Sequence, residues 1–371
     1  MTATLLPLLL APNNFTPRAR TPWAGQDIYA RYKKCVTTET CIGESWEVSC
    51  DPDFPSQILD ASSGKPTGQT LQEAISADPE ALISPRLARE LGSDASCPLL
   101  VKLVNAASPL SVQIHPGDNF PELTPTECGK PESWLILHAN PGCGIYIGLR
   151  RPWTAAALHS ALASGKFSGD DMHFIPVQEG DYFDLAPGTL HAIGPGVTIL
   201  EPQLIKFGKS GKTYRAWDWN RRYDARGMED SVNGKARDLH VEQALKLFDP
   251  TLQHGPEFAG TTMRTAARSQ PSAGVNVQIY PANENYAVRR MQMLPGAAAR
   301  LEIAAGQGFA TVTVLSGNLT IGQKSDEACV KIPTGYSAFI PWAGLPCALD
   351  TSLGADFALI THAALDIAVT R

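Results

Sequence analysis

Short apolar segments separated by glycine and proline turns are the feature of this sequence that most restricts its fold. The clearest segments are 136–137 with 144–147, 181–185, 197–201, 275–280, 309–315 and 337–340. Between them lie turn sequences such as Asn140-Pro141-Gly142 and Pro333-Thr334-Gly335. Many short strands with regular turns are typical of β-sandwiches and β-barrels. We therefore expect a mostly β protein.

Helical composition is confined to a few stretches. Good helix formers with apolar residues at mixed spacings of three and four predict helices over 71–77, 79–91, 153–164 and 241–248. The last of these ends at Asp249-Pro250, a stop signal. We expect a small helical insertion at about residues 69–98 of an otherwise β frame.

A weak internal repeat predicts two related barrels. Residues 180–188 and 335–344 both read as a glycine turn, a strand and a proline turn. A histidine, His191, follows the first proline turn, whereas Leu345 follows the second. We predict a metal-binding domain over 1–250, which includes the insertion, and a second domain without metal ligands over 251–371.

Charge and composition exclude several classes of function. The chain has 371 residues and a net charge of −6 with both signs interspersed, so it lacks the basic stripe of a nucleic-acid-binding protein. The apolar N-terminal run contains Pro7 and Pro12 and no preceding positive charge, and we interpret it as a strand rather than a signal peptide. No later apolar run approaches the roughly 20 residues of a membrane helix. The eight cysteines form no C-x-x-C pair, which indicates mostly buried, reduced thiols in a cytoplasmic protein. The oligomeric state cannot be read from the sequence.

Four side chains beside turns or in strands predict a mononuclear metal site. Gln113 and His115 are two residues apart in an apolar run, so both point to one face of a strand. Glu132 and His191 each lie near a proline or glycine turn. Zinc takes imidazole nitrogen and carboxylate oxygen readily, and catalytic zinc sites keep a position open. A single histidine is more often a core or surface residue, and we interpret the remaining ones in that way: 138, 159, 173, 240, 254 and 362.

Lys130 and Glu201 are candidates for proton transfer. Lys130 lies two residues before Glu132, and an ammonium beside a dication has a lowered pKa and can serve as a base or proton shuttle. The alternative is a solvated turn lysine. Glu201 ends the strand that follows the His191 turn, where alternation can direct it into the cavity.

A basic loop precedes Arg215. Arginine binds phosphate through two hydrogen bonds or stabilises an oxyanion. Lys206, Lys209 and Lys212 supply a local positive field for an anionic substrate, unless the loop is merely exposed. Ser111 is a candidate hydroxyl donor to a phosphate.

Several of these stretches, in this order, resemble the type I mannose-6-phosphate isomerases, a family of metal-dependent cupin enzymes. The motifs are PLSVQIHP, KPE, PGTLHAIGPG followed by Glu201-Pro202-Gln203, and TYRAWDWNRR. The resemblance covers about residues 5–250, and 251–371 only as a generic second cupin. It implies two cupin-type (jelly-roll) β-barrels and one zinc ion per chain, bound by Gln113, His115, Glu132 and His191. It places the catalytic arginine on Arg215 and the lysine of the K-P-E motif on Lys130.

The resemblance also implies the reaction and its substrate. The family interconverts mannose 6-phosphate and fructose 6-phosphate through an enediol(ate), so the expected partner is a small sugar phosphate. Two departures matter, since many members have an aspartate at the place of Gly211 and a histidine at the place of Gly129. The acid–base roles of those side chains, such as ring opening, must then pass to another group, for which Asp218 or water is a candidate.

Three alternatives stay open at this point. One is an isomerase for a different sugar or sugar phosphate. A second is a non-catalytic cupin that binds phosphosugars, which the missing aspartate at 211 makes conceivable. The third is an iron-dependent cupin oxygenase that uses His115, Glu132 and His191 as a triad of two histidines and one carboxylate. Gln113 and the basic loop count against this last alternative.

Overall fold

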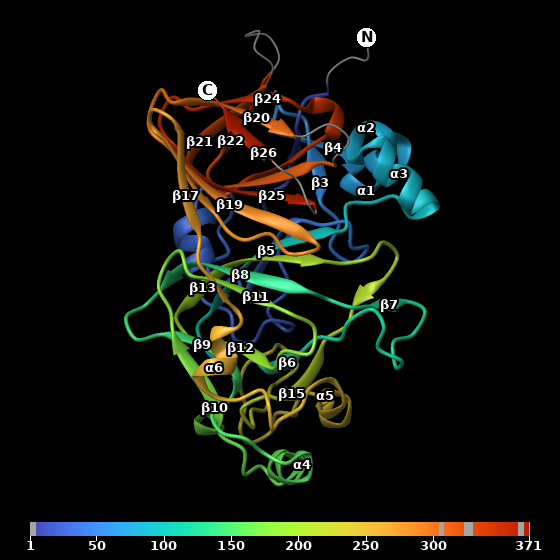
Figure 1. Cartoon of the computed structure of the whole chain (residues 1–371), viewed down its shortest axis with the longest axis vertical. Coiled ribbons are helices and arrows are strands. Elements are labelled where there is room, and N and C mark those ends of the chain that lie inside the picture. Colours follow the sequence, from blue (N-terminus) through green and yellow to red (C-terminus); the bar gives the residue numbers. More distant parts are fainter. Residues whose placement is uncertain (1–4, 304–307, 323–328, 363–366, 371) are drawn as a thin grey trace.

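Two bodies built of β-sheet lie one above the other in the computed structural model (Figure 1). The structure describes residues 5–303, 308–322, 329–362 and 367–370. The lower body in Figure 1 comes mainly from the middle of the chain, and the upper body mainly from the C-terminal third. The predicted mostly β class is confirmed.

The lower body consists of two facing sheets. The first runs in the order β16-β11-β8-β13-β5-β2 and the second in the order β10-β9-β12-β6-β15. The first sheet contains β2 (Glu44–Val48), β5 (Leu99–Ala106), β8 (Glu132–Ala139), β11 (Tyr182–Leu185), β13 (Val197–Leu204) and β16 (Met263–Arg264). The second contains β6 (Val112–Ile114), β9 (Gly144–Leu149), β10 (Met172–Pro176), β12 (His191–Ile193) and β15 (Tyr214–Trp217). Alternate residues of the two sheets meet in a common core, which contains Trp134 and Ile136 from β8 and Ile145 and Ile147 from β9.

The upper body is organised around one long strand, β21 (Ala310–Gly322). Its first half pairs with β23 and β25, and its second half with β22 and β24. The other strands are β17 (Ala267–Ser272), β18 (Val275–Ile279), β19 (Tyr286–Met293), β20 (Ala298–Ile303), β22 (Cys329–Pro333), β23 (Ser337–Ile340), β24 (Cys347–Asp350), β25 (Ala355–His362) and β26 (Ile367–Thr370).

Chain segments cross between the two bodies. The N-terminal strands β1 (Leu8–Leu10), β3 (Gln57–Leu59) and β4 (Pro66–Thr70) extend the sheet of the upper body, because β1 pairs with β23. In the other direction, β16 pairs with β11 of the lower body. The division into 1–250 and 251–371 stays a prediction, and the pairings show that strands from both sides of that boundary share sheets.

Three short helices form the predicted insertion, α1 (Leu71–Ala77), α2 (Pro79–Ile83) and α3 (Pro85–Leu91), and they lie beside the upper body (Figure 1). The single helix expected over 79–91 is wrong. Ser84 interrupts it with a φ of 101°, because a proline disfavours helical backbone at the residue before it and has no N–H to donate. The Ser84 side chain then caps α3 by accepting a hydrogen bond from the Leu87 N–H (3.2 Å).

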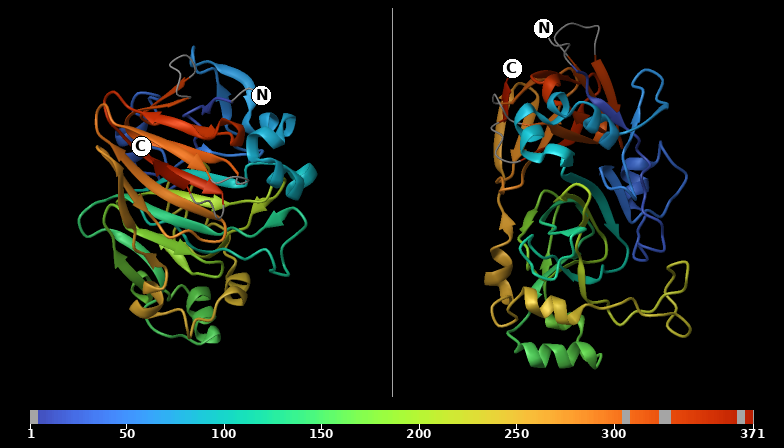
Figure 2. Two further views of the ribbon diagram at one scale, coloured as in Figure 1. Left: turned by 45° about the horizontal axis from the view of Figure 1, so that its top comes forward. Right: turned by 90° about the vertical axis from the view of Figure 1, so that its right-hand side faces the viewer.

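The remaining short elements surround the lower body or connect the sheets. The helices α4 (Ala155–Ala163), α5 (Val241–Leu247) and α6 (Gly255–Gly260) lie at the end of the lower body that is away from the upper body. Two other views of the molecule show the same arrangement (Figure 2). The others are η1 (Ile28–Lys33), η2 (Gly92–Asp94), η3 (Gly169–Asp171), η4 (Trp342–Gly344), β7 (Glu127–Cys128) and β14 (Ser210–Gly211).

Two expectations from composition can be compared with the structure. Within the described residues, none of the helices combines the length and the apolar character needed to cross a membrane. All eight cysteines are free thiols, as expected. The expectation that most are buried is wrong, because only Cys97, Cys128 and Cys347 are. Cys329, for example, occupies an outward position of β22, a strand whose residues are alternately exposed and buried.

Truncation of a core side chain between the facing sheets is expected to destabilise the protein. Ile136 is fully buried in that core, so Ile136→Ala removes buried methyl groups and leaves a cavity. We expect a loss of about 2–5 kcal/mol in the free energy of unfolding, measured by urea denaturation followed by circular dichroism. Leu252→Ala, at a position that is 70% exposed, is the control. Equal effects of the two changes would contradict this packing.

Candidate metal centre and catalytic cavity

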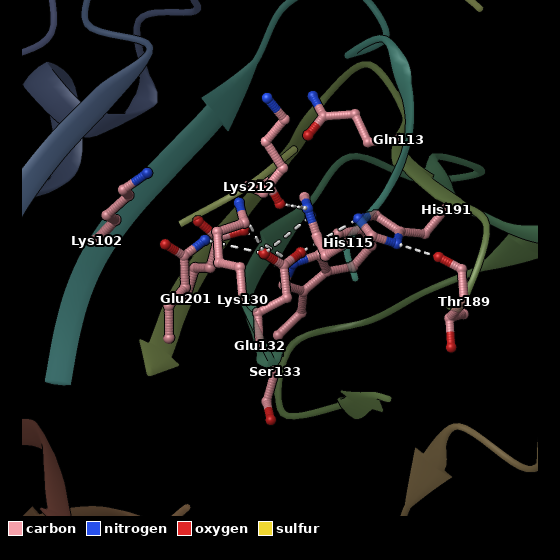
Figure 3. Close-up of polar contacts among 12 residues, drawn as sticks. Lys102, Gln113, His115, Lys130, Glu132, Ser133, Thr189, His191, Glu201 and Lys212 are labelled. Carbon is pink, nitrogen blue, oxygen red and sulfur yellow. Dashed lines mark hydrogen bonds and ion pairs between the residues drawn. The ribbon is translucent and has the colours of Figure 1, made fainter. Parts of the chain in front are cut away.

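Three of the four predicted metal ligands form one buried cluster. The donor atoms of His115, Glu132 and His191 all lie within 4.8 Å of one another. His115 Nε2 is 3.3 Å from Glu132 Oε2, and His191 Nε2 is 3.2 Å from Glu132 Oε1. Figure 3 shows the Glu132 carboxylate facing both imidazoles. The cluster therefore has the residue types and the separation of a mononuclear metal site.

Strands from both facing sheets bring these side chains together. Glu132 is the first residue of β8 in one sheet, whereas His191 begins β12 and His115 follows β6 in the other. The turn before β12 depends on Gly188, whose φ of 85° favours glycine and whose N–H donates to the His115 carbonyl (2.8 Å). The site therefore forms only when the two sheets close on each other.

Hydrogen bonds to the backbone orient both imidazoles. Nδ1 of His115 lies 3.2 Å from the Lys212 carbonyl, and Nδ1 of His191 lies 2.8 Å from the Thr189 carbonyl. Because a carbonyl only accepts, each Nδ1 donates its proton to the backbone and each Nε2 faces the cluster. This is the arrangement of metal-ligating histidines, whose second ring nitrogen is held by an acceptor.

The His115 ring has an unsatisfied buried nitrogen. Its Nε2 is buried and has no hydrogen-bond partner. Burial, together with the Lys130 ammonium, lowers the pKa of His115 to about 3, so the ring is neutral. A neutral imidazole nitrogen without a partner in a buried polar cluster needs an explanation, and a metal cation provides one.

The Glu132 carboxylate stays ionised inside the protein. Burial raises the pKa of this group, but the Lys130 ammonium and the imidazole contacts hold it well below its usual range. Lys130 Nζ lies 3.2 Å from Glu132 Oε2, and Gln203 Nε2 donates to the same oxygen (2.9 Å). Two imidazoles and an ionised carboxylate fit a divalent cation such as zinc.

Gln113 lies on the strand next to His191. It is directly opposite His191 in the pairing of β6 and β12, and it lines the adjacent cavity. Its neighbours Val112 and Ile114 belong to the core on the other face of β6, which agrees with the predicted alternation. Its amide nitrogen donates to Ser111 Oγ (3.0 Å). A role for Gln113 as the fourth ligand stays a prediction.

A cavity of about 470 Å³ adjoins the cluster. Acidic groups and aromatic rings line part of the cavity. The cationic side chains that line it are Arg20, Lys102, Lys130, Arg215 and Arg237. The lysines of the basic loop were expected to supply the positive field. Instead, Lys206 pairs with Asp118 (2.7 Å) and Lys212 pairs with Glu127 (2.5 Å). Residues distant from one another in the chain thus provide the local positive charge.

Lys130 and Glu201 both line the cavity and lie side by side (Figure 3). Burial lowers the pKa of Lys130, but the carboxylates of Glu132 and Glu201 outweigh it, and the net shift is upward. The protein groups alone therefore raise the pKa of Lys130, opposite to the expected direction. A bound dication would be required to lower this pKa. Burial, with the nearby Glu132 charge, raises the pKa of Glu201 to about 7, and its Oε1 accepts a hydrogen bond from Trp134 Nε1 (3.0 Å).

The other predicted site residues take different places. Arg215 lines the cavity on β15, where its Nη1 donates to the Asp238 carbonyl (2.9 Å) and its buried Nε has no partner. Ser111 is buried and accepts from Gln113. Lys212 orients His115 through its carbonyl while its ammonium binds Glu127. Phosphate binding by Ser111 and Lys212 stays a prediction.

The two glycines that depart from the family pattern have packing reasons. A Cβ on Gly129 would lie 2.8–2.9 Å from backbone atoms of the segment 116–118, so no side chain fits without a shift of that loop. A Cβ on Gly211 would lie 2.3 Å from Ile205 Cδ1 and 3.1 Å from the Lys130 side chain. Lys130 therefore occupies the space beside position 211, where the resemblance led us to expect an aspartate.

Several residues of the site were not predicted. Gln203 supports Glu132, Trp134 binds Glu201, and Lys102, Glu44 and Trp46 line the cavity. Alternation along β13 from Glu201 is a signal for Gln203, since both point the same way. For the others, pairing of β2 with β5 decides the location, and that pairing is not visible in the sequence.

Comparisons with known proteins agree with this geometry. Residues 24–140 match the family model for phosphomannose isomerase type I, catalytic domain. A mannose-6-phosphate isomerase from Streptococcus mutans is 31% identical over 229 residues, which cover 61% of this chain and 64% of that protein. The putative mannose-6-phosphate isomerase YvyI from Bacillus subtilis is 26% identical over 308 residues, which cover 83% of this chain and 85% of that protein. The chain is related to the type I phosphomannose isomerases.

Solved structures of phosphomannose isomerases have the same fold. A mannose 6-phosphate isomerase from Bacillus subtilis superposes with a TM-score of 0.74 at 22% identity, covering 96% of this chain and 100% of that one. A mannose 6-phosphate isomerase bound with zinc and yttrium superposes with a TM-score of 0.66 at 15% identity, covering 98% and 100%. At such identities the likeness concerns the fold, and it confirms the predicted fold class. The Streptococcus mutans relative is matched over less than two thirds of its own length.

Loss of the central carboxylate is expected to abolish metal binding. Glu132→Gln removes the negative charge that faces both imidazoles, so the affinity of the metal-free protein for Zn²⁺ should fall more than about 100-fold, beyond the change typical when a hydrogen-bond partner of a ligand is removed. Isothermal titration measures it. The control is His138→Ala, on the same strand but outside the cluster. Unchanged zinc affinity in Glu132→Gln would refute the site.

A methyl group on Gly129 is expected to destabilise the loop beside Lys130. The added carbon would meet backbone rather than a movable side chain, so Gly129→Ala should lower the free energy of unfolding by about 1–3 kcal/mol. Thermal denaturation measures the change. Gly260→Ala is the matched control, because a Cβ there meets nothing within 4 Å and alanine favours a helix. If both variants were as stable as the parent, the packing reason would be wrong.

Proposed function

We propose that this chain is a zinc-dependent isomerase that interconverts mannose 6-phosphate and fructose 6-phosphate through an enediol(ate). The observation that carries the proposal is the buried cluster of His115, Glu132 and His191 beside a cavity lined with cationic groups. The names of the related proteins support the same activity. The cavity volume lies within the usual range for small-ligand sites, about 300–1,000 Å³.

The chemical problem is the acidity of a proton next to a carbonyl group. His115, Glu132 and His191, with Gln113 as the proposed fourth ligand, would hold a divalent ion, and that ion would supply stabilisation of negative charge on the sugar oxygens. Arg215 adds a fixed positive group, since the Asp238 carbonyl holds one of its nitrogens while its Nε is free of any hydrogen bond. Such preorganised donors act most strongly where charge develops.

Two groups are proposed to move the proton between C2 and C1. Glu201 has a pKa raised to about 7, near the pH at which a general base works best. Lys130 carries a charge stabilised by two carboxylates, so it can donate a proton or hold a substrate oxygen. Both remain candidates for the base, and their neighbouring positions allow one to act on the other.

The phosphate of the substrate supplies negative charge that the cavity can hold. Although the chain is acidic overall, Arg20, Lys102 and Arg215 converge on the cavity, whereas Arg237, which also lines it, is paired with Asp218 (2.7 Å). Arginine binds a phosphate through two hydrogen bonds. The proposed partner is therefore a small sugar phosphate.

Metal removal and readdition test the proposal. Chelation should abolish the conversion of mannose 6-phosphate to fructose 6-phosphate, and Zn²⁺ should restore it. Full activity of a metal-free preparation would refute metal dependence, and an iron-loaded protein that consumes O2 without isomerising mannose 6-phosphate would favour the oxygenase alternative. Exchange of the C2 proton with deuterium separates an enzyme from a phosphosugar sensor, because a sensor shows no exchange.

A second candidate is isomerisation of a different sugar phosphate. Gly211 lines the cavity where many relatives have an aspartate, and this difference favours an altered sugar preference. A panel of aldose phosphates compared by kcat/KM discriminates between the two. A higher kcat/KM for another aldose phosphate would identify that sugar phosphate as the substrate. The proposed metal site would not be affected by this result.

Removal of the Arg215 guanidinium is expected to reduce turnover with the fold intact. Arg215→Ala loses a fixed donor at the reacting oxygens, so kcat should fall about 100-fold to 1,000-fold, as for the loss of one oxyanion donor. Steady-state kinetics measures it, and circular dichroism monitors folding. Arg226→Ala, at an exposed position of the same region, is the control. Near-normal turnover in Arg215→Ala would exclude its catalytic role.

A further inference from the structure

The strand β2 has one face toward the cavity and the other toward the upper body. Glu44 and Trp46 line the cavity. Ser45 and Glu47 alternate with them, point the opposite way, and are buried. The strand is thus a wall of the cavity whose reverse face is not exposed to solvent.

A buried ion pair holds that reverse face. Lys33, at the end of η1, is fully buried, and its Nζ lies 2.7 Å and 2.9 Å from the two carboxylate oxygens of Glu47. The Lys33 ammonium also donates a hydrogen bond to the Gly335 carbonyl oxygen (2.6 Å). The ammonium therefore has an acceptor for each of its donors. Ser45 Oγ donates to Glu47 Oε1 (2.6 Å).

The other partners of this network belong to the upper body. Ser337 Oγ, on β23, donates to Glu47 Oε2 (2.8 Å) and lies 3.0 Å from Thr313 Oγ1 on β21. Gly335 approaches η1 so closely that a Cβ there would lie 2.0 Å from the Tyr32 carbonyl oxygen. Backbone and side chains of the upper body thus meet η1 and β2 at one point.

Burial of two charges is expensive, so a stabilising role alone explains this network poorly. Apolar replacements of a buried ion pair are often neutral or stabilising, whereas removal of one partner is strongly destabilising. What the pair does impose is a specific geometry, because five short hydrogen bonds and ionic contacts converge on Glu47 and Lys33. Any shift of β2 breaks several of them together.

The position of β2 decides the geometry of the cavity wall. Trp46 lies opposite Lys102 in the pairing of β2 with β5, and the Lys102 ammonium lies 4.3 Å from the centre of the Trp46 ring. Glu44 Oε2 lies 3.7 Å from the same ammonium and accepts from Trp46 Nε1 (3.0 Å). A displaced β2 would move Glu44 and Trp46 relative to Lys102 and Glu201, which lie opposite each other in the pairing of β5 with β13.

We propose that the upper body sets the position of this cavity wall through the buried network of Lys33, Glu47 and Ser337, which act as positioning residues for Glu44 and Trp46. The kinetic part of the inference rests on the proposed function. The upper body, which has no metal cluster among its described residues, thereby gains a role in substrate binding without contacting the substrate.

The test distinguishes a change in the position of β2 from a loss of stability of the protein. The double variant Lys33→Met/Glu47→Leu replaces the ion pair by apolar groups, so the full chain should keep its stability while the register of β2 is no longer held. We expect KM for mannose 6-phosphate to rise about tenfold with kcat changed much less, the signature of lost binding contacts. Ser337→Ala removes one hydrogen bond and should shift KM in the same direction, and Ser337→Thr should restore it.

A control variant breaks an ion pair of the upper body that does not touch β2. Asp356 binds Arg290 (2.6 Å), so Asp356→Asn should lower the melting temperature and leave KM unchanged. If Asp356→Asn raised KM as much as the network variants, the effect would be general destabilisation and the proposal would fail. If the double variant did not fold, Ser337→Ala and Ser337→Thr would decide the outcome alone.

A spectroscopic readout keeps the inference independent of activity. Tryptophan labelled with fluorine at position 5 gives a Trp46 signal in ¹⁹F NMR, assigned from its loss in Trp46→Phe. We expect this signal to shift in the network variants and to stay in place in Asp356→Asn. An unshifted Trp46 signal together with unchanged KM in a folded network variant would overturn the proposal. If the parent protein lacked isomerase activity, the proposed function would fail, and the Trp46 signal would still test the network.

Discussion

The structure depends on one buried carboxylate held between positive and neutral partners. Glu132 faces two imidazoles and an ammonium, and a Gln203 amide donates to it as well. A buried carboxylate without such partners would lose its charge. Its partners come from both facing sheets and from the segment before β8, so the closure of the lower body and the formation of the site are one event.

Neighbouring ionisable groups around this carboxylate have different charge states. The same burial that penalises every charge leaves His115 neutral, Glu132 ionised and Glu201 with a pKa near 7. The differences arise from their neighbours: Lys130 and the imidazoles outweigh burial at Glu132, whereas at Glu201 burial and the Glu132 charge outweigh the lowering of the pKa by Lys102 and Lys130. Carboxyl groups with separated pKa values in one cavity are the usual basis for distinct roles in proton transfer and charge stabilisation.

The upper body and the N-terminal segment form a frame for the lower body. Strand β1 joins the sheet of the C-terminal strands, and η1 brings Lys33 to Glu47 between the two bodies. Strands from both sides of residue 250 therefore share sheets. This interleaving explains how a body without metal ligands among its described residues influences a cavity in the other body.

The sequence by itself determined the strand-rich class and the three residues of the buried cluster. Alternation and turn chemistry are local, so His115, Glu132 and His191 can be selected from strand parity and adjacent prolines and glycines, and the family motifs add Gln113 and Arg215. The break at Ser84 was also local but was overlooked, although Pro85 signals it. Only the tertiary structure decided which cations line the cavity, why Gly129 has no side chain, and where Glu44, Trp46 and Lys102 meet. These depend on the pairing of strands far apart in the chain, and long-range pairing is set by the packing of the whole protein, which no local pattern encodes.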